Sequence, residues 1–123
     1  MTLFNFAIGN GDAHRKNFSL LTSDDGTIAL SPAYDLVSSR LAIPAEADEL
    51  ALTVNGKRSR LRRDDFLAFA HHCNIAPSYA KRKVADLLAL EETFTEMIAA
   101  SQLSHDRRSG LAHIIATRLD RLR

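Results

Sequence analysis

The feature that most constrains the fold is a polar cluster between two apolar segments near the start of the chain. The stretch GNGDAHRKNFSLL, residues 9–21, places an aspartate, a histidine, a basic pair and an asparagine after two glycines, and then turns apolar. The apolar residues 3–8 are compatible with the end of a buried helix, which Gly9 can close in the left-handed conformation. We therefore expect the polar cluster to form a loop between a helix and a strand.

A short hairpin is expected directly after this loop. Residues 18–22 and 27–31 are apolar or β-branched, and the turn-forming sequence SDDG at 23–26 separates them. A hairpin folds the chain back to its starting point. It would therefore return the segment SPAYDL, which contains Asp35, to the neighbourhood of the polar loop.

A second hairpin is predicted further along. Residues 44–49 are polar and aperiodic, which is typical of a surface loop. Residues 50–54 and 57–61 then flank the dipeptide Asn55-Gly56, a pair that favours a type I′ turn.

The rest of the chain has helical periodicity. Asp64 or Asp65 can cap a first helix, Pro77 suits the first turn of a longer one, and Ser104 can cap a terminal helix. The apolar positions recur at 3.6-residue spacing in the longer helix (Ala80, Val84, Leu87, Leu88, Phe94, Ile98) and in the terminal helix (Leu111, Ile115, Leu119, Leu122), with arginines elsewhere on the terminal helix. The predicted class is α+β and mainly helical, with two small β-hairpins and three to five helices.

Length and composition set further limits. A chain of 123 residues suits one domain over residues 1–123, and a formal charge of +1 gives no global indication of a nucleic-acid or membrane partner. The lone Cys73 excludes an internal disulfide. No apolar run approaches the roughly 20 residues of a membrane span, and no signal peptide is visible. These features predict a cytoplasmic protein with no membrane partner.

The polar cluster has the composition of a phosphoryl-transfer site. Asp12 can act as a general base, and the amide of Asn17 and the carboxylate of Asp35 are oxygen donors of the kind that Mg²⁺ prefers. The interval between Asp12 and Asn17 is the D-x-x-x-x-N spacing of protein-kinase catalytic loops. Lys16 can neutralise charge on a transferred phosphoryl group.

The stretches GNGDAHRKNFSLL and LSPAYDL together resemble the signature of the HipA-type serine/threonine kinases, toxin components of bacterial toxin–antitoxin modules. The resemblance implies a kinase-like carboxy-terminal lobe, with Asp12 as catalytic base and with Asn17 and Asp35 as ligands of Mg²⁺ in the Mg²⁺–ATP complex. It also places Lys16 near phosphate, while His14 belongs to the active loop and braces it. The motifs are specific in the first 36 residues and weak after them, although the likeness covers nearly the whole chain.

We expect this chain to hold no nucleotide-binding lobe of its own, because the segment Gly9–Gly11 is too short for G-x-G-x-x-G. We therefore expect weak ATP binding and little turnover by this chain alone, with a separate amino-terminal lobe as one partner and a protein substrate as another. One alternative is a noncatalytic remnant that binds an antitoxin or a substrate. Another is a metal-dependent phosphohydrolase or nuclease that uses Asp12, His14 and Asp35.

Three other features carry expectations of their own. The segment His71-His72-Cys73 suggests helix packing rather than a metal site, because adjacent helical residues point in different directions. The basic segment KRSRLRR, residues 57–63, and the five arginines after residue 106 are expected to form solvated surface. Their alternatives are a face close to DNA in a complex with a DNA-binding antitoxin, and a site for an acidic helix. Exposed apolar residues at a lobe interface (Leu3, Phe4, Phe6, Tyr34) would favour a homodimer.

Overall fold

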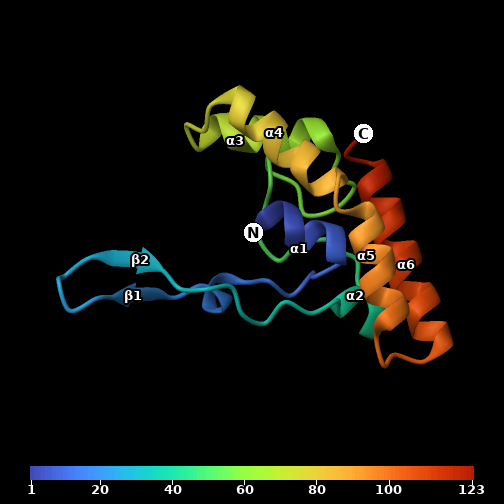
Figure 1. The fold of residues 1–123 in the computed structure, drawn as a ribbon. Coiled ribbons are helices and arrows are strands. Elements are labelled where there is room, and N and C mark those ends of the chain that lie inside the picture. Colours follow the sequence, from blue (N-terminus) through green and yellow to red (C-terminus); the bar gives the residue numbers. More distant parts are fainter.

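The computed structural model describes all residues 1–123, and it confirms an α+β fold that is mainly helical (Figure 1). The only sheet has two antiparallel strands. In chain order the elements are α1 (Thr2–Ile8), the 3-10 turn η1 (Arg15–Asn17), β1 (Leu20–Thr22), β2 (Ile28–Leu30), the single-turn helix α2 (Ser39–Ala42), α3 (Arg63–His72), α4 (Pro77–Leu88), α5 (Glu91–Ala100) and α6 (His105–Asp120).

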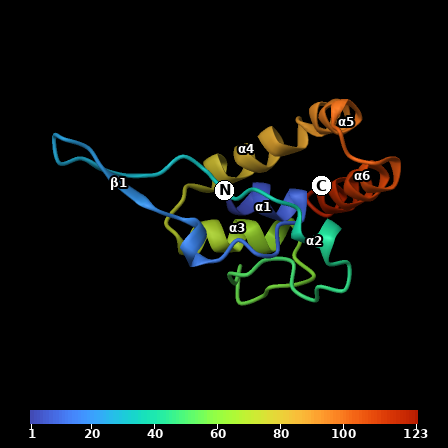
Figure 2. The same cartoon turned by 90° about the horizontal axis from the view of Figure 1, so that it is seen from below.

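Helix α1 lies at the centre of the helical body, and the other helices surround it. It packs against α6 and α4, while α5 packs along α6 and α3 along α4. The β1–β2 hairpin projects away from this body in both views (Figures 1 and 2). The polar loop therefore lies between a buried helix and a protruding hairpin.

The core is built around the aromatic ring of Phe6, which is completely buried. Its ring centroid lies 5.0 Å from that of Phe66, and the guanidinium groups of Arg118 and Arg121 stack over it at 4.8 and 5.4 Å. The other members of the buried apolar cluster come from all parts of the chain (Ala7, Leu50, Val54, Leu61, Val84, Leu87, Ile115, Leu119, Leu122). The prediction that Phe6 is exposed is wrong, because α6 and its arginines cover it.

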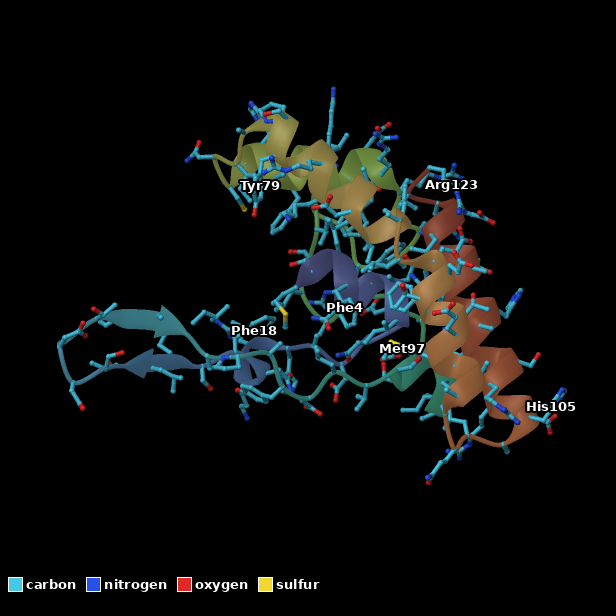
Figure 3. All side chains as sticks on the ribbon, viewed as in Figure 1. Phe4, Phe18, Tyr79, Met97, His105 and Arg123 are labelled. Atoms are coloured by element: carbon cyan, nitrogen blue, oxygen red, sulfur yellow. The ribbon has the colours of Figure 1, made fainter.

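The other residues expected at an exposed interface differ from Phe6. Leu3 and Phe4 are half-buried, and the Phe4 ring lies 6.1 Å from that of Phe94 on α5. Figure 3 shows Phe4 on α1 and Met97 on α5. Tyr34 is exposed, as predicted.

Gly9 ends α1 in the way that the sequence predicts. Its φ of 71° is left-handed, and the following N–H of Asn10 donates to the carbonyl of Asn5 at 2.8 Å. A Cβ atom at Gly9 would lie 2.9 Å from Cγ2 of Ile114 on α6. Glycine is therefore required both by the backbone conformation and by the close approach of α6.

The first hairpin is confirmed, although its strands are shorter than predicted. Leu20 pairs with Leu30 and Thr22 with Ile28, and the turn places Gly26 at a φ of 81°. All six strand residues are exposed. The hairpin is therefore held by its own backbone hydrogen bonds and by contacts at its base.

The second hairpin is largely wrong. Its turn is present, with Asn55 and Gly56 at φ values of 51° and 75°, but the pairing consists of one bridge between Val54 and Lys57. The extended conformation ends at Arg60, whose φ is 55°. Leu50, Val54 and Leu61 all enter the core, so packing rather than strand pairing determines the course of this segment.

Two helix predictions also require correction. The long helix after Pro77 is two helices, because the chain turns at Ala89 and Leu90, which lets α4 pack on α3 and α5 pack on α6. Neither Asp64 nor Asp65 is the cap of α3, since both lie in its first turn. Instead the Asp65 carboxylate accepts the backbone N–H of Arg62 at 3.0 Å. No helix combines the length and apolar character needed to cross a membrane.

The caps of the later helices are as predicted, whereas the terminal arginines are not simply solvated. Pro77 begins α4, and the Ser104 hydroxyl accepts the backbone N–H of Arg107 at the start of α6. Arg118 is only 6% exposed, and its Nη1 lies 3.0 Å from Oε1 of Glu49 as an ion pair without hydrogen-bond alignment. Arg121 donates to both Glu49 carboxylate oxygens, at 2.6 and 3.1 Å.

Glu49 therefore ties the loop before the Asn55-Gly56 turn to the end of α6. Burial alone would raise the pKa of Glu49, but the hydrogen bonds from Arg121 and from the Leu61 N–H, together with the charge of Arg118, hold that pKa below its ordinary value. The carboxylate is thus ionised at neutral pH and balances a buried guanidinium.

We predict that Glu49→Ala destabilises the chain by about 3–5 kcal/mol, because it leaves Arg118 buried without a counter-charge. The adjacent Asp48→Ala is the control, since the Asp48–Arg58 pair at 3.4 Å is exposed and is worth about 1 kcal/mol or less. Urea unfolding of both variants measures the difference. Equal losses would contradict the structural role of Glu49.

Candidate functional site

The residues predicted to form a site lie on the loop after α1 and at the base of the hairpin. Asp12, His14 and Lys16 are exposed on this loop, and Asn17 is half-buried at the end of η1. The His14 N–H donates to the Asn17 side-chain oxygen, and the Asn17 N–H donates to the His14 carbonyl, both at 3.0 Å. This reciprocal pair fixes the tight turn that orients Asn17, so His14 braces the loop through its backbone.

The hairpin brings Asp35 back to the loop, as the order of elements predicts. The Asn17 side-chain amide donates a hydrogen bond to the Asp35 carboxylate. The two residues are separated by the whole hairpin, so their contact closes its base. Phe18 lies at the same base, where the loop passes into β1 (Figure 3).

The backbone of Asp35 is in an unusual conformation. Its φ of 55° is left-handed, a region that aspartate tolerates better than most residues but that still costs energy. Its carbonyl accepts a hydrogen bond from the buried side chain of Asn10 at 3.2 Å. Such a conformation persists only where surrounding contacts hold it, which is common at functional sites.

The hydroxyl of Tyr34 ties the hairpin base to the loop from the other side. It donates to the Lys16 carbonyl at 2.9 Å and lies 2.7 Å from the Ser19 hydroxyl. The Tyr-Asp pair of the sequence therefore contacts the loop at three points: the Tyr34 hydroxyl, the Asp35 carboxylate and the Asp35 carbonyl.

A third set of contacts attaches the loop to α2. The Gly11 N–H donates to the Ser39 hydroxyl at 2.8 Å, and that hydroxyl donates to the Glu46 carboxylate at 2.9 Å. A Cβ at Gly11 would lie 2.6 Å from Oε2 of Glu46. Glycine therefore leaves the space that the Glu46 carboxylate occupies next to the backbone. This contact supports the loop next to Asp12.

Sequence reasoning missed Asn10, the Tyr34 hydroxyl and Ser39 as parts of the site. The sequence pattern assigns Asn10 no role beyond its place in the segment Gly9–Gly11, whereas the structure buries it to 1% exposure. An asparagine between two glycines at the end of an apolar helix is the one local signal that points to it. Ser39 carries no signal, because its partners lie far away in the sequence.

The oxygen donors suit Mg²⁺, which is commonly held by one or two protein carboxylates together with nucleotide phosphates. Asn17 and Asp35 offer an amide and a carboxylate in direct contact. No three His, Cys, Asp or Glu side chains converge anywhere in the chain. Asp12, His14 and Asp35 therefore do not form a three-ligand cluster that would support the alternative of a metal-dependent phosphohydrolase or nuclease.

The His71-His72-Cys73 segment lies exposed at the end of α3, so the prediction that it packs in the structure is wrong. Its ring contacts are local: His72 Nδ1 lies 2.7 Å from the Ala68 carbonyl, and the His71 and His72 rings meet edge to face with centroids 6.2 Å apart. The segment ends the helix at the surface, where no other helix covers it.

The basic side chains of segment 57–63 are exposed except for the half-buried Arg63, and they are partly neutralised. Lys57 lies 2.7 Å from Asp65, and this hydrogen bond, followed by those from Asn55 and the Arg62 N–H, lowers the pKa of Asp65 despite its burial. Arg58 pairs with Asp48, and Arg63 donates to the Arg123 carbonyl. Arg60 and Arg62, in contrast, form no ion pair, and both are exposed at the surface.

Comparison with known proteins places these features in a family. Residues 1–102 match the HipA-like C-terminal domain. "Putative kinase Y4mE" of Sinorhizobium fredii (strain NBRC 101917 / NGR234) is 31% identical over 127 residues, which cover 92% of this chain and 30% of that protein. "Putative kinase Y4dM" of the same organism is 44% identical over 70 residues, or 55% of this chain and 17% of that protein.

A solved structure agrees with the sequence matches. HipA of Shewanella oneidensis MR-1, in complex with HipB and its operator DNA, matches with a TM-score of 0.71 and 26% identity over 98% of this chain. The chain spans less than a third of the length of each of these proteins. Because the family match covers most of the chain, including the polar loop and the hairpin, this chain belongs to the family of HipA-like C-terminal domains.

Proposed function

We propose that the chain is the carboxy-terminal lobe of a HipA-type serine/threonine kinase, in which Asp12 is the catalytic base and Asn17 and Asp35 hold Mg²⁺ of the Mg²⁺–ATP complex. The observation that carries this proposal is the contact between Asn17 and Asp35 at the base of the hairpin. The D-x-x-x-x-N interval puts Asp12 on the same short loop.

The reaction would transfer the γ-phosphoryl group of ATP to a substrate hydroxyl and release ADP. Asp12 is exposed, so its carboxylate can accept the hydroxyl proton of a protein substrate. Lys16, also exposed, would offset negative charge on the transferred group. The bound Mg²⁺ would supply charge neutralisation at the phosphates.

The parts that hold the adenosine are proposed to come from an amino-terminal lobe. The relatives are more than three times as long as the stretch they share with this chain, and the hairpin and the site are open to solvent on their outer sides. We therefore expect this chain alone to bind ATP weakly and to turn over little. Phosphoryl transfer depends chiefly on positioning, which a single lobe provides incompletely.

We predict that the chain binds Mn²⁺, used in place of Mg²⁺, and that Asp35→Asn weakens this binding at least roughly tenfold by removing the charged ligand. Titration calorimetry measures the affinity. Asp12→Asn should leave Mn²⁺ binding nearly unchanged while lowering any phosphoryl transfer roughly 10²–10⁴-fold.

The control is Asp25→Asn, because Asp25 is an exposed carboxylate at the tip of the same hairpin, where it accepts the Thr27 N–H at 2.9 Å. Equal weakening by Asp25→Asn and Asp35→Asn would contradict a metal site at the hairpin base. If the Asp12→Asn chain acts in the cell as the unchanged chain does, that result would favour the noncatalytic remnant that binds an antitoxin or a substrate.

A DNA-binding antitoxin is proposed as a partner, with the basic segment 57–63 facing the DNA backbone. The support is that HipA of Shewanella oneidensis was solved with HipB and operator DNA, and that Arg60 and Arg62 are exposed and unpaired here. Free guanidinium groups at a surface release counterions from DNA when they bind phosphates.

We predict that this chain binds nonspecific duplex DNA with an affinity that falls as salt rises. The Arg60→Ala/Arg62→Ala variant should reduce the slope of log affinity against log salt by about 2, since each phosphate contact contributes about 0.9. Fluorescence anisotropy across a salt series measures the slope. The control is Lys81→Ala/Arg107→Ala, which removes the same charge from exposed positions on α4 and α6. An equal change in both variants would contradict a localised DNA face.

A further inference from the structure

Asn10 makes a set of contacts that the proposed roles do not explain. The residue is 1% exposed, and its side chain forms hydrogen bonds to three residues. The amide nitrogen donates to Oδ1 of Asn5 and to the carbonyl of Asp35, both at 3.2 Å, and its oxygen accepts the Asp12 N–H at 3.3 Å. Both amide protons and one oxygen lone pair are therefore used.

These contacts join the two halves of the site through one buried amide. Asp12 lies on the loop that follows α1, whereas Asp35 lies after the second strand of the hairpin. The one hydrogen bond that joins either carboxylate to the other segment runs from the Asn17 side chain to the Asp35 carboxylate. Asn10 contacts both segments at their backbones. Its own backbone N–H donates to the Asn5 carbonyl at the end of α1, so the amide is held by the buried core helix.

We propose that Asn10 is a positioning residue, which holds the backbones of Asp12 and Asp35 at a fixed separation so that the proposed base and the proposed metal ligand are aligned. This inference rests on the proposed function. The left-handed φ of Asp35 explains why such a contact is needed, because a residue in that conformation relaxes when its carbonyl is released.

The other supports of the loop do not perform this task. Ser39 holds Gly11, and the Tyr34 hydroxyl holds the Lys16 carbonyl, but neither side chain contacts Asp12 or the Asp35 backbone carbonyl. Removing Asn10 should therefore change the relation between Asp12 and Asp35 while the rest of the loop stays attached. Groups that orient metal ligands in this way typically change metal affinity 10–100-fold when they are lost.

The test uses Asn10→Ala in the full chain, with Mn²⁺ as the probe. We expect its Mn²⁺ affinity to fall roughly 10–100-fold. In the ion-free protein we expect the NMR signals of the Asp35 backbone amide and the Asn17 side-chain amide to move. Asn55→Ala is the control, because Asn55 also has a left-handed φ and donates to a carboxylate, that of Asp65, away from the site.

A second variant and a measurement on the wild type cover the case in which Asn10→Ala does not fold. Asn10→Asp keeps the shape and the acceptor for the Asp12 N–H but loses the donors to the Asp35 carbonyl and to Oδ1 of Asn5, so it should move the Asp35 signals more than those of Asp12. In the wild type, Mn²⁺ should broaden the side-chain amide signals of Asn10 and leave those of Asn55 sharp.

The outcomes separate this inference from the proposed function. If the wild type binds no Mn²⁺, the proposed metal site is refuted, and the ion-free signals of Asp35 and Asn17 still decide the role of Asn10. If those signals stay in place in a folded Asn10 variant, the positioning role is overturned. It is equally overturned if Asn10→Ala and Asn55→Ala change Mn²⁺ affinity alike.

Discussion

The hydrogen bond from the Asn17 side chain to the Asp35 carboxylate is the contact on which the rest of the site depends. Together with the hydrogen bonds of the Tyr34 hydroxyl, it anchors the β1–β2 hairpin, a two-stranded ribbon whose strand residues are all exposed and which would be marginal in water on its own. The contact closes the base of the ribbon and turns a local strand–turn–strand unit into one wall of a site. The hairpin thus brings an acid residue back beside an amide, and these are the two side chains that we propose as ligands of a divalent cation.

The stability of this arrangement comes from the helical body rather than from the hairpin. Phe6 on α1 is fully buried under Arg118 and Arg121, and Glu49 forms ion pairs with both guanidinium groups. Helix α1 is therefore a fixed base, and the polar loop begins at its last residue. The Asn10 side chain links this helix to the candidate site, because it is hydrogen-bonded to Asn5 on α1 and to the backbones of Asp12 and Asp35. The exposed side chains of Asp12 and Asp35 are in this way supported by the buried residues Asn10 and Phe6, while the outer side of the candidate site is open to solvent.

The local features of this fold could be predicted from the sequence, and the long-range ones could not. Gly9, the Asn55-Gly56 turn and Pro77 act on their own backbone, so their effects follow from residue type alone. The division of the long helix into α4 and α5 depends on packing against other helices, which helical periodicity does not report. The ion pairs of Glu49 with Arg118 and Arg121 join residues that are distant in sequence. The same holds for the candidate site, where motif spacing indicated Asp12, Asn17 and Asp35, but the buried amide of Asn10 and the Ser39 contact required coordinates.

The most direct measurement of the central claim is a crystal structure of this chain grown with MnCl2, in which anomalous scattering locates the ion independently of any assumed site. The account predicts one strong peak at the base of the hairpin, with an oxygen of Asn17 and the carboxylate of Asp35 among its ligands and Asp12 facing the same space. A peak at another acidic group, or ordered density with Asp35 turned away from Asn17, would contradict it.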